Sequence, residues 1–268
     1  MIEAFGIAAM MSMGAVLGML GAGGSILTLP ILVYLFGVSP TLATGYSLAI
    51  VGASALAGAV EYLRRGQSSP RMALVFGLPA MVGVYLTRRF LFPALPDPVL
   101  RFGGIVLTKD AAVMILFAAF MLVAAVSMLR SSRGPAAVDA VRHELRNVPL
   151  ILGLGFTVGV FTGMVGAGGG FMILPVLVLL GGLPVKVAIG TDLLIIAAKS
   201  LVGFVGEMQA VEGIDYGFVG LVTLLPLAGM AVGTYLNRRV SAPFLRAAFG
   251  WFLLAMGTYI VAREALFT

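Results

Sequence analysis

The chain has 268 residues, of which 60% are apolar and 10% charged, and its 17 Lys and Arg against 11 Asp and Glu give a net charge of +6. Soluble domains are about 45–50% apolar and about 25% charged, so this composition excludes an ordinary soluble globule and a disordered chain. A mean hydropathy of +1.11 indicates an integral membrane protein instead. The absence of Cys and the single His143 exclude disulfides, thiolate metal sites and most His-based catalysis.

The charged residues lie between apolar runs, and each run predicts a helix. In chain order the expected helices are residues 2–20, 26–37, 41–63, 71–90, 110–130, 148–166, 171–181, 186–206, 215–236 and 244–263. Most of these runs have about 20 residues, which as a helix is enough to cross roughly 30 Å of hydrocarbon.

Two of the runs are too short to cross the bilayer. Residues 26–37 and 171–181 each follow a cluster of glycines, and a helix of about 11 residues reaches only about 16 Å. Each short run therefore predicts a helical hairpin that enters the bilayer and turns back. The non-helical tip of such a hairpin is tolerated only inside protein or beside a polar cavity.

The second half of the chain repeats the first half. The alignments run in one order and pair Gly18–Pro30 with Gly163–Pro175, Ala43–Leu48 with Ala188–Leu193, Gly83–Arg89 with Gly233–Arg239, and Pro98–Arg101 with Pro243–Arg246. Each half carries five segments, and an odd number inverts the second copy relative to the first. Inverted repeats are typical of secondary transporters.

The predicted fold is an all-α integral membrane protein. It consists of two inverted-topology repeats of about five helical segments each, with a short broken or re-entrant helix in each repeat. The predicted domains are a first transmembrane repeat at 1–130, a basic cytoplasmic connector at 131–147 and a second transmembrane repeat at 148–268.

Basic residues set the expected orientation. The basic connector is placed in the cytoplasm, and the loop assigned to Glu207, Glu212 and Asp215, which lacks basic residues, is placed outside. One predicted outer loop breaks the rule, because it carries Arg88, Arg89, Arg101 and Lys109. The paired Tyr-Leu-x-Arg-Arg ends that include Arg88 are interpreted as interfacial anchors, with an electropositive vestibule for anions as the alternative.

The paired glycine-rich turns carry a family resemblance. Gly21–Ser25 and Gly166–Gly170 are each followed by a proline, Pro30 and Pro175, and then by an Ala-x-Gly-x-x-Leu patch. With these motifs the sequence resembles the TauE/SafE sulfite exporter family of membrane permeases, over nearly the whole chain. The resemblance implies a multi-pass protein of the bacterial inner (plasma) membrane that exports sulfite, sulfonates and related organic anions.

The same glycines predict an anion site. A helix that starts at Ser25 or Phe171 leaves backbone N–H groups unpaired at a partly positive end, and glycines let an anion approach closely. The predicted ligands from these turns are Gly23, Gly24, Ser25, Gly168, Gly169 and Gly170. In the alternative interpretation the glycines only permit tight helix packing.

The helix after each hairpin contributes polar side chains at depth. Asp192 and Lys199 lie within one apolar run, where charges are costly and mark a site or pathway by default. Lys199 is expected to offset the charge of a bound anion, and Asp192 to carry a coupling proton. The alternative is a structural ion pair between the two. Further predicted ligands are Thr44, Tyr46, Ser47 and Thr191, although Ser and Thr in such helices often bond only their own backbone.

These features predict a secondary transporter for small anions. The sequence has no G-x-x-x-x-G-K-[ST] motif for ATP. The expected partners are a small anionic substrate and the lipid bilayer, with no nucleic acid, cofactor or metal, and the oligomeric state stays open. The alternatives are a passive anion channel and an intramembrane enzyme. An enzyme is disfavoured because His143 lies outside the predicted helices and Asp192 is the single acid at depth.

Overall fold

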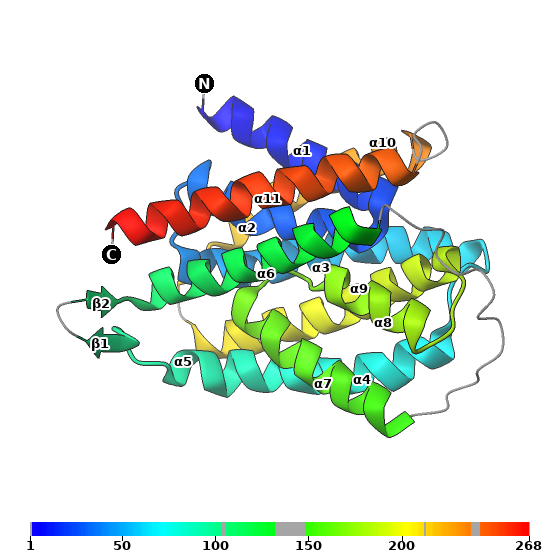
Figure 1. Ribbon diagram of the computed structural model, residues 1–268, viewed down its shortest axis with the longest axis horizontal. Helices are drawn as coiled ribbons and strands as arrows, with labels where there is room; N and C mark the ends of the chain where they lie inside the picture. Colours follow the sequence, from blue (N-terminus) through cyan, green and yellow to red (C-terminus); the bar gives the residue numbers. More distant parts are fainter. Residues whose placement is uncertain (1, 103–104, 132–147, 212, 237–241, 268) are drawn as a thin grey trace.

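The computed structural model describes residues 2–102, 105–131, 148–211, 213–236 and 242–267, and most of these residues are helical (Figure 1). The elements of the first half are α1 (Ile2–Leu20), the 3₁₀-helix η1 (Gly21–Leu27), α2 (Thr28–Tyr34), α3 (Pro40–Arg64), α4 (Pro70–Leu86), the π-helix η2 (Thr87–Leu91), α5 (Phe92–Ala94), β1 (Leu100–Phe102), β2 (Ile105–Leu107) and α6 (Lys109–Ser131).

The second half begins at α7, after residues 132–147 of the predicted connector, which lie outside the described residues. Its elements are α7 (Val148–Val165), α8 (Gly170–Leu179), α9 (Val185–Ala210), α10 (Tyr216–Leu236) and α11 (Ala242–Phe267). The predicted helices are therefore found in order, with most of their ends shifted by a few residues.

Three local features differ from the prediction. The expected helix 26–37 begins as a 3₁₀ stretch at Gly21 and becomes α-helical only at Thr28, so no new α-helix starts at Ser25. Helix α9 continues to Ala210, which places Glu207 inside the helix and corrects its assignment to a loop. The strands β1 and β2 pair antiparallel, which the pattern of apolar runs does not predict, because each strand has only three residues.

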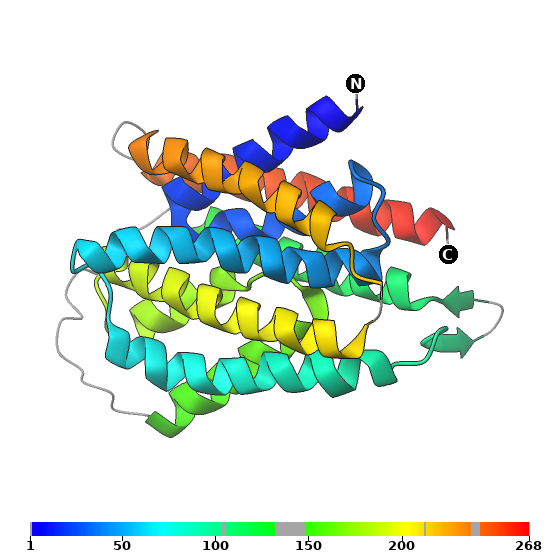
Figure 2. The same cartoon turned by 180° about the vertical axis from the view of Figure 1, so that it is seen from behind.

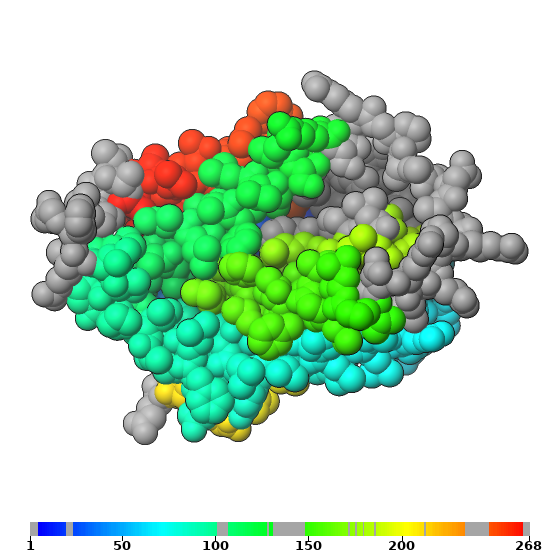
Figure 3. All heavy atoms as spheres, turned by 60° about the horizontal axis from the view of Figure 1, so that its bottom comes forward, coloured from blue at the N-terminus to red at the C-terminus, as the bar shows by residue number. Residues whose placement is uncertain are grey.

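Two long helices, α3 and α9, cross side by side in the middle of the molecule (Figures 1 and 2). Around them, α1 packs against α10, α4 packs against both α7 and α9, and α6 packs against α11. The face in Figure 3 is covered by α4, α6 and α7, with α11 beyond α6. The central pair is the most enclosed, and α3 is buried along most of its length.

Glycines allow the closest of these crossings. A Cβ added to Gly155 of α7 would lie 2.5 Å from the carbonyl oxygen of Phe76 in α4, closer than real atoms approach. A Cβ added to Gly14 of α1 would overlap the backbone of Pro226 in α10 in the same way. Helix association in membranes depends on such small residues, because lipid gives no hydrophobic driving force between apolar helices.

The outward faces are apolar. Large side chains such as Leu78 of α4, Val123 of α6, Leu224 of α10 and Trp251 of α11 are each more than half exposed. In the described part of the chain, six helices are long and apolar enough to cross a membrane. Bands of exposed apolar side chains on long helices fit a lipid environment, so the chain is a multi-pass membrane protein.

Candidate functional site

The two glycine-rich turns touch each other at the centre of the molecule. The Ser25 hydroxyl in η1 donates a hydrogen bond of 3.1 Å to the carbonyl oxygen of Ala167, which precedes α8. A Cβ added to Gly168 would lie 3.1 Å from the Cβ of Ser25 and closer still to Val51 of α3. Ser25 is completely buried. The two turns that carry the predicted glycine ligands are thus in direct contact.

The second turn needs glycine for its backbone. Gly166, Gly168 and Gly169 have φ values of +72°, +61° and +70°, in the left-handed region that favours glycine. Gly169 is the N-cap of α8 and Gly170 is the first helical residue. The start of α8, with its partly positive helix end, therefore lies in the interior beside Ser25.

Lys199 lies next to this helix start. Its side chain in α9 is completely buried, and its Nζ donates a hydrogen bond of 2.8 Å to Thr162 Oγ1 in α7. A Cβ added to Gly169 would lie 3.5 Å from the same Nζ and would overlap the side chain of Thr162. Two sources of positive potential, an ammonium group and a helix N-terminus, thus converge on one buried place.

Asp192 is buried on the same helix as Lys199. Both of its carboxylate oxygens lack a hydrogen-bond partner among the described residues, and the side chain is completely buried. No ion pair joins it to Lys199 in the described structure, where the carboxylate pairs are those of Glu61 and Glu207. Seven residues of helix separate the two by about 10 Å along the axis. Ser47 of α3, the repeat counterpart of Asp192, is also buried, and its hydroxyl has no hydrogen-bond partner in the described part of the chain.

The other predicted ligands lie at different depths. Gly24 packs against α1 at Leu17, and Gly23 lies in the same 3₁₀ stretch. At one end of α3, the Tyr46 hydroxyl accepts a hydrogen bond of 3.1 Å from the backbone N–H of Asp215. Thr191 accepts a bond of 2.9 Å from the N–H of Ser69, in the loop at the opposite end of α3. Tyr46 and Thr191 therefore lie away from the place where Ser25, Gly169 and Lys199 come together.

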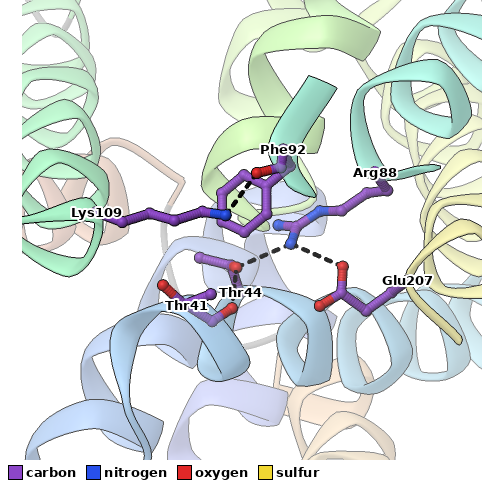
Figure 4. A network of polar contacts seen from close by, with 6 residues as sticks. All are labelled: Thr41, Thr44, Arg88, Phe92, Lys109 and Glu207. Atoms are coloured by element: carbon purple, nitrogen blue, oxygen red, sulfur yellow. Dashed lines mark hydrogen bonds and ion pairs between the residues drawn. The ribbon is translucent and has the colours of Figure 1, made fainter. Parts of the chain in front are cut away.

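Thr44 belongs to a second polar cluster that the sequence did not predict (Figure 4). Arg88 Nη1 lies 3.1 Å from Glu207 Oε2 and donates a bond of 3.0 Å to Thr44 Oγ1. Arg88 is completely buried, so its assignment as an interfacial anchor is wrong. Its guanidinium carbon lies 4.5 Å from the centre of the Phe92 ring, and Lys109 Nζ lies 4.4 Å from the same ring centre.

A signal for this second cluster was present in the sequence. The basic residues of the predicted outer loop broke the positive-inside pattern, and two of them, Arg88 and Lys109, have partners inside the protein. The sequence does not predict Glu207 as a member of this cluster, because the apolar run that defines α9 ends one residue before it. Gly45 makes room for its carboxylate, since a Cβ there would lie 2.7 Å from Glu207 Oε1.

Comparison with known proteins agrees with this architecture. The sequence model described as "Sulfite exporter TauE/SafE" matches residues 6–260 of the chain. A probable membrane transporter protein of Xylella fastidiosa is 28% identical over 254 residues, which cover 94% of this chain and 92% of the relative.

More distant relatives carry the same description. The probable membrane transporter protein YunE of Bacillus subtilis is 23% identical and covers 95% of each chain, and one from Methanocaldococcus jannaschii is 25% identical and covers 92% of each. No solved structure matches the chain. Because the family match spans nearly its full length, the chain belongs to the TauE/SafE sulfite exporter family of membrane transporters.

Proposed function

We propose that the protein is a secondary transporter that exports small sulfur-containing anions, such as sulfite and sulfonates, across the bacterial inner membrane. The observation that carries the proposal is the buried Lys199 ammonium beside the N-terminus of α8. A buried cation without a carboxylate partner costs free energy, and it marks a site by default within a membrane. An anion that binds there supplies the missing negative charge.

The donors around Lys199 suit an oxyanion. Lys199 Nζ has three N–H groups, and the one described bond uses one of them, to Thr162. The first backbone N–H groups of α8, at Gly170 and Phe171, follow Gly169 and add donors beside Lys199. The hydroxyl of Ser25 already donates to Ala167, so it lines the site without a free hydrogen. A sulfite or sulfonate group presents several oxygens, each of which accepts from such donors. The sulfur-containing class itself follows from the family and not from the geometry.

We further propose that the two halves, residues 1–130 and 148–268, are inverted repeats, with η1–α2 and α8 as re-entrant segments. The pairing of helices supports this. Under exchange of the halves, α1 corresponds to α7 and α4 to α10, and the contact of α1 with α10 becomes the observed contact of α7 with α4. In the α3–α9 and α6–α11 pairs each helix contacts its own repeat counterpart, so exchange of the halves leaves both contacts unchanged. Transport would then proceed by rocking of the elements around a fixed midplane site.

Asp192 is proposed as the proton-coupling group. Its carboxylate is buried, has no hydrogen-bond partner among the described residues and lies on the same helix as Lys199. A carboxyl that alternates between charged and neutral forms can link the occupancy of the anion site to a proton gradient.

The direct test is uptake of radiolabelled methanesulfonate into liposomes that contain the purified protein. Lys199→Met keeps the side-chain volume, removes the charge and should reduce uptake to the background of protein-free liposomes. Lys186→Met is the matched control, because Lys186 is exposed at the start of the same helix, and uptake should stay at the wild-type rate. Wild-type uptake by Lys199→Met would contradict the proposed site, and uptake that never saturates with concentration would indicate a channel.

A further inference from the structure

We infer that Arg88 forms a second oxyanion-binding subsite, separate from the one at Lys199, where η2 meets α9. The proposal rests on the proposed function only for the kind of anion, a sulfonate or sulfite group. The evidence is the unused hydrogen-bonding capacity of Arg88 and the arrangement of charges around it.

The guanidinium of Arg88 uses one of its three nitrogens. Nη1 serves both Glu207 Oε2 and Thr44 Oγ1, whereas Nε and Nη2 have no hydrogen-bond partner among the described residues. These two nitrogens form the side-on fork of the guanidinium, whose parallel N–H groups match two oxygens of one oxyanion. The side chain is completely buried, so an unfilled fork is unfavourable and a bidentate anion relieves it.

The surroundings favour an anion at the fork. In Figure 4 one terminal nitrogen of Arg88 faces Glu207 and Thr44, and the other points toward Phe92 and Lys109. Lys109 Nζ donates a hydrogen bond of 2.5 Å to the carbonyl oxygen of Phe92 and lies over the same ring as Arg88. Two cations, Arg88 and Lys109, therefore share one aromatic ring beside the fork.

Three carboxylates lie near the two cations, and one oxygen of each is engaged. Asp97 Oδ1 accepts a hydrogen bond of 3.2 Å from the backbone N–H of Lys109. Asp110, beside Lys109 in the sequence, accepts hydrogen bonds of 2.8 Å and 2.5 Å from the backbone N–H and the hydroxyl of Thr41. Glu207 binds Arg88 through Oε2, while its Oε1 has no hydrogen-bond partner among the described residues. Glu207 is thus the one carboxylate bound to Arg88 in the described structure, and an anion at the fork competes with its charge.

The backbone around Arg88 is irregular in a way that is common at functional sites. Residues Thr87–Leu91 form a π-helical segment between α4 and α5, and such segments occur frequently at functional sites. Thr44, which Arg88 contacts, also packs through its backbone against Gly166 of the central turn. The subsite thus lies one packing contact away from the central site.

The test is equilibrium binding of methanesulfonate to the full-length protein in nanodiscs, measured by titration calorimetry. Measurements are made in the Lys199→Met background, so that the central site does not contribute. Residual binding is expected in this background. Arg88→Lys keeps the charge and loses the fork, so it should weaken this binding about tenfold or more, as expected for the loss of a charge-assisted hydrogen bond.

Glu207→Gln gives the opposite and more diagnostic result. The amide oxygen still accepts from Nη1, while the competing negative charge is removed, so methanesulfonate should bind several-fold more tightly. Arg89→Lys is the control, because Arg89 is the neighbouring arginine and its described bond goes to the backbone of Gln209 at the surface. Methanesulfonate should bind to Arg89→Lys with the same affinity as to the protein that carries Lys199→Met alone.

Some outcomes separate this proposal from the proposed function. If Lys199→Met abolishes all binding, and Arg88→Lys and Glu207→Gln in the otherwise wild-type protein leave affinity unchanged, the subsite is overturned and the central site stands. If the wild-type protein shows no saturable flux but binding still changes in opposite directions in the two variants, the transport proposal fails and the subsite stands. If Arg88→Lys does not fold, an unchanged affinity in Glu207→Gln is sufficient to overturn the subsite.

Discussion

Two completely buried cations, Lys199 and Arg88, are handled differently by the protein. Arg88 is paired with the carboxylate of Glu207 through one nitrogen, so its charge has a counter-ion within the protein while its fork stays open. Lys199 has the hydroxyl of Thr162 as its described hydrogen-bond partner, and the carboxylate nearest along its own helix, Asp192, is about 10 Å away along the helix axis. The proposed central site is consequently built on the charge of Lys199, which has no described carboxylate partner.

This difference makes a prediction for stability. Because a buried charge without a counter-ion is unfavourable, Lys199→Met should leave the midpoint of thermal unfolding in detergent unchanged or raise it. Arg88→Met strands the Glu207 carboxylate and should destabilise the fold by about 3–5 kcal/mol, the usual effect of breaking a buried ion pair. Strong destabilisation by Lys199→Met would instead assign Lys199 a structural role.

Gly169 makes a second prediction at the scale of one residue. Gly169→Ala forces an L side chain into a left-handed backbone at about 1–2 kcal/mol, and its Cβ displaces the Thr162 side chain that holds Lys199. Transport in liposomes should fall at least about tenfold. Gly66→Ala carries the same backbone strain, at φ +65°, but its Cβ meets nothing within 4 Å, so wild-type flux is expected. Equal flux in the two variants would contradict the account.

Asp192 is tested through the dependence on a proton gradient. Asp192→Asn keeps the size of the side chain but cannot take up and release a proton. Methanesulfonate flux should therefore lose its acceleration by a pH gradient while passive exchange continues. Asp215→Asn is the control, since Asp215 caps α10 by accepting a bond from the N–H of Phe218 and an amide can still accept it. An unaltered gradient dependence in Asp192→Asn would exclude the coupling role.

At the scale of elements, the length of each apolar run was enough to predict the helices but not their ends. The run that defines α9 predicted an end at residue 206, but the helix continues to Ala210, and buried Arg88 compensates the charge of Glu207 there. Such compensation comes from a helix far away in the sequence, so no local pattern contains it. The glycine turns were predicted because the repeat showed them twice, whereas the Arg88 cluster has no described counterpart.

The glycine-mediated crossing of α4 and α7 gives a prediction for one element. Gly155→Ala places a Cβ 2.5 Å from the Phe76 carbonyl oxygen, and should destabilise the protein by about 1–3 kcal/mol, as overpacking does. Gly153→Ala, two residues earlier on the same helix, meets nothing within 4 Å. It should be neutral or slightly stabilising because alanine favours helix. Thermal unfolding in detergent measures both, and equal midpoints would contradict the tight crossing.

At the scale of the whole molecule, the arrangement fixes which ends of the helices share a side of the membrane. The loop before α4 and the loop before α10 lie at opposite ends of α9. Gly190, near the start of α9, packs against Gln67 in the loop before α4, and the end of α9 leads into the loop before α10. The chain has no cysteine, so introduced thiols are the only ones present. Ser68→Cys should react with a membrane-impermeant maleimide from the cytoplasm, and Tyr216→Cys from outside. Labelling of both from one side would contradict the proposed topology.

The most direct test of the central claim is to locate a bound anion. Selenate has the same oxygens as a sulfur oxyanion, and its selenium gives an anomalous signal at its own absorption edge. The sulfur atoms of the protein, all in its 15 methionines because it has no cysteine, do not give this signal. In crystals grown with selenate, we predict a selenium peak within hydrogen-bonding reach of Lys199 Nζ, between Thr162 and the start of α8. Selenium only on the lipid-facing surface, or none at concentrations that saturate transport, would contradict the account.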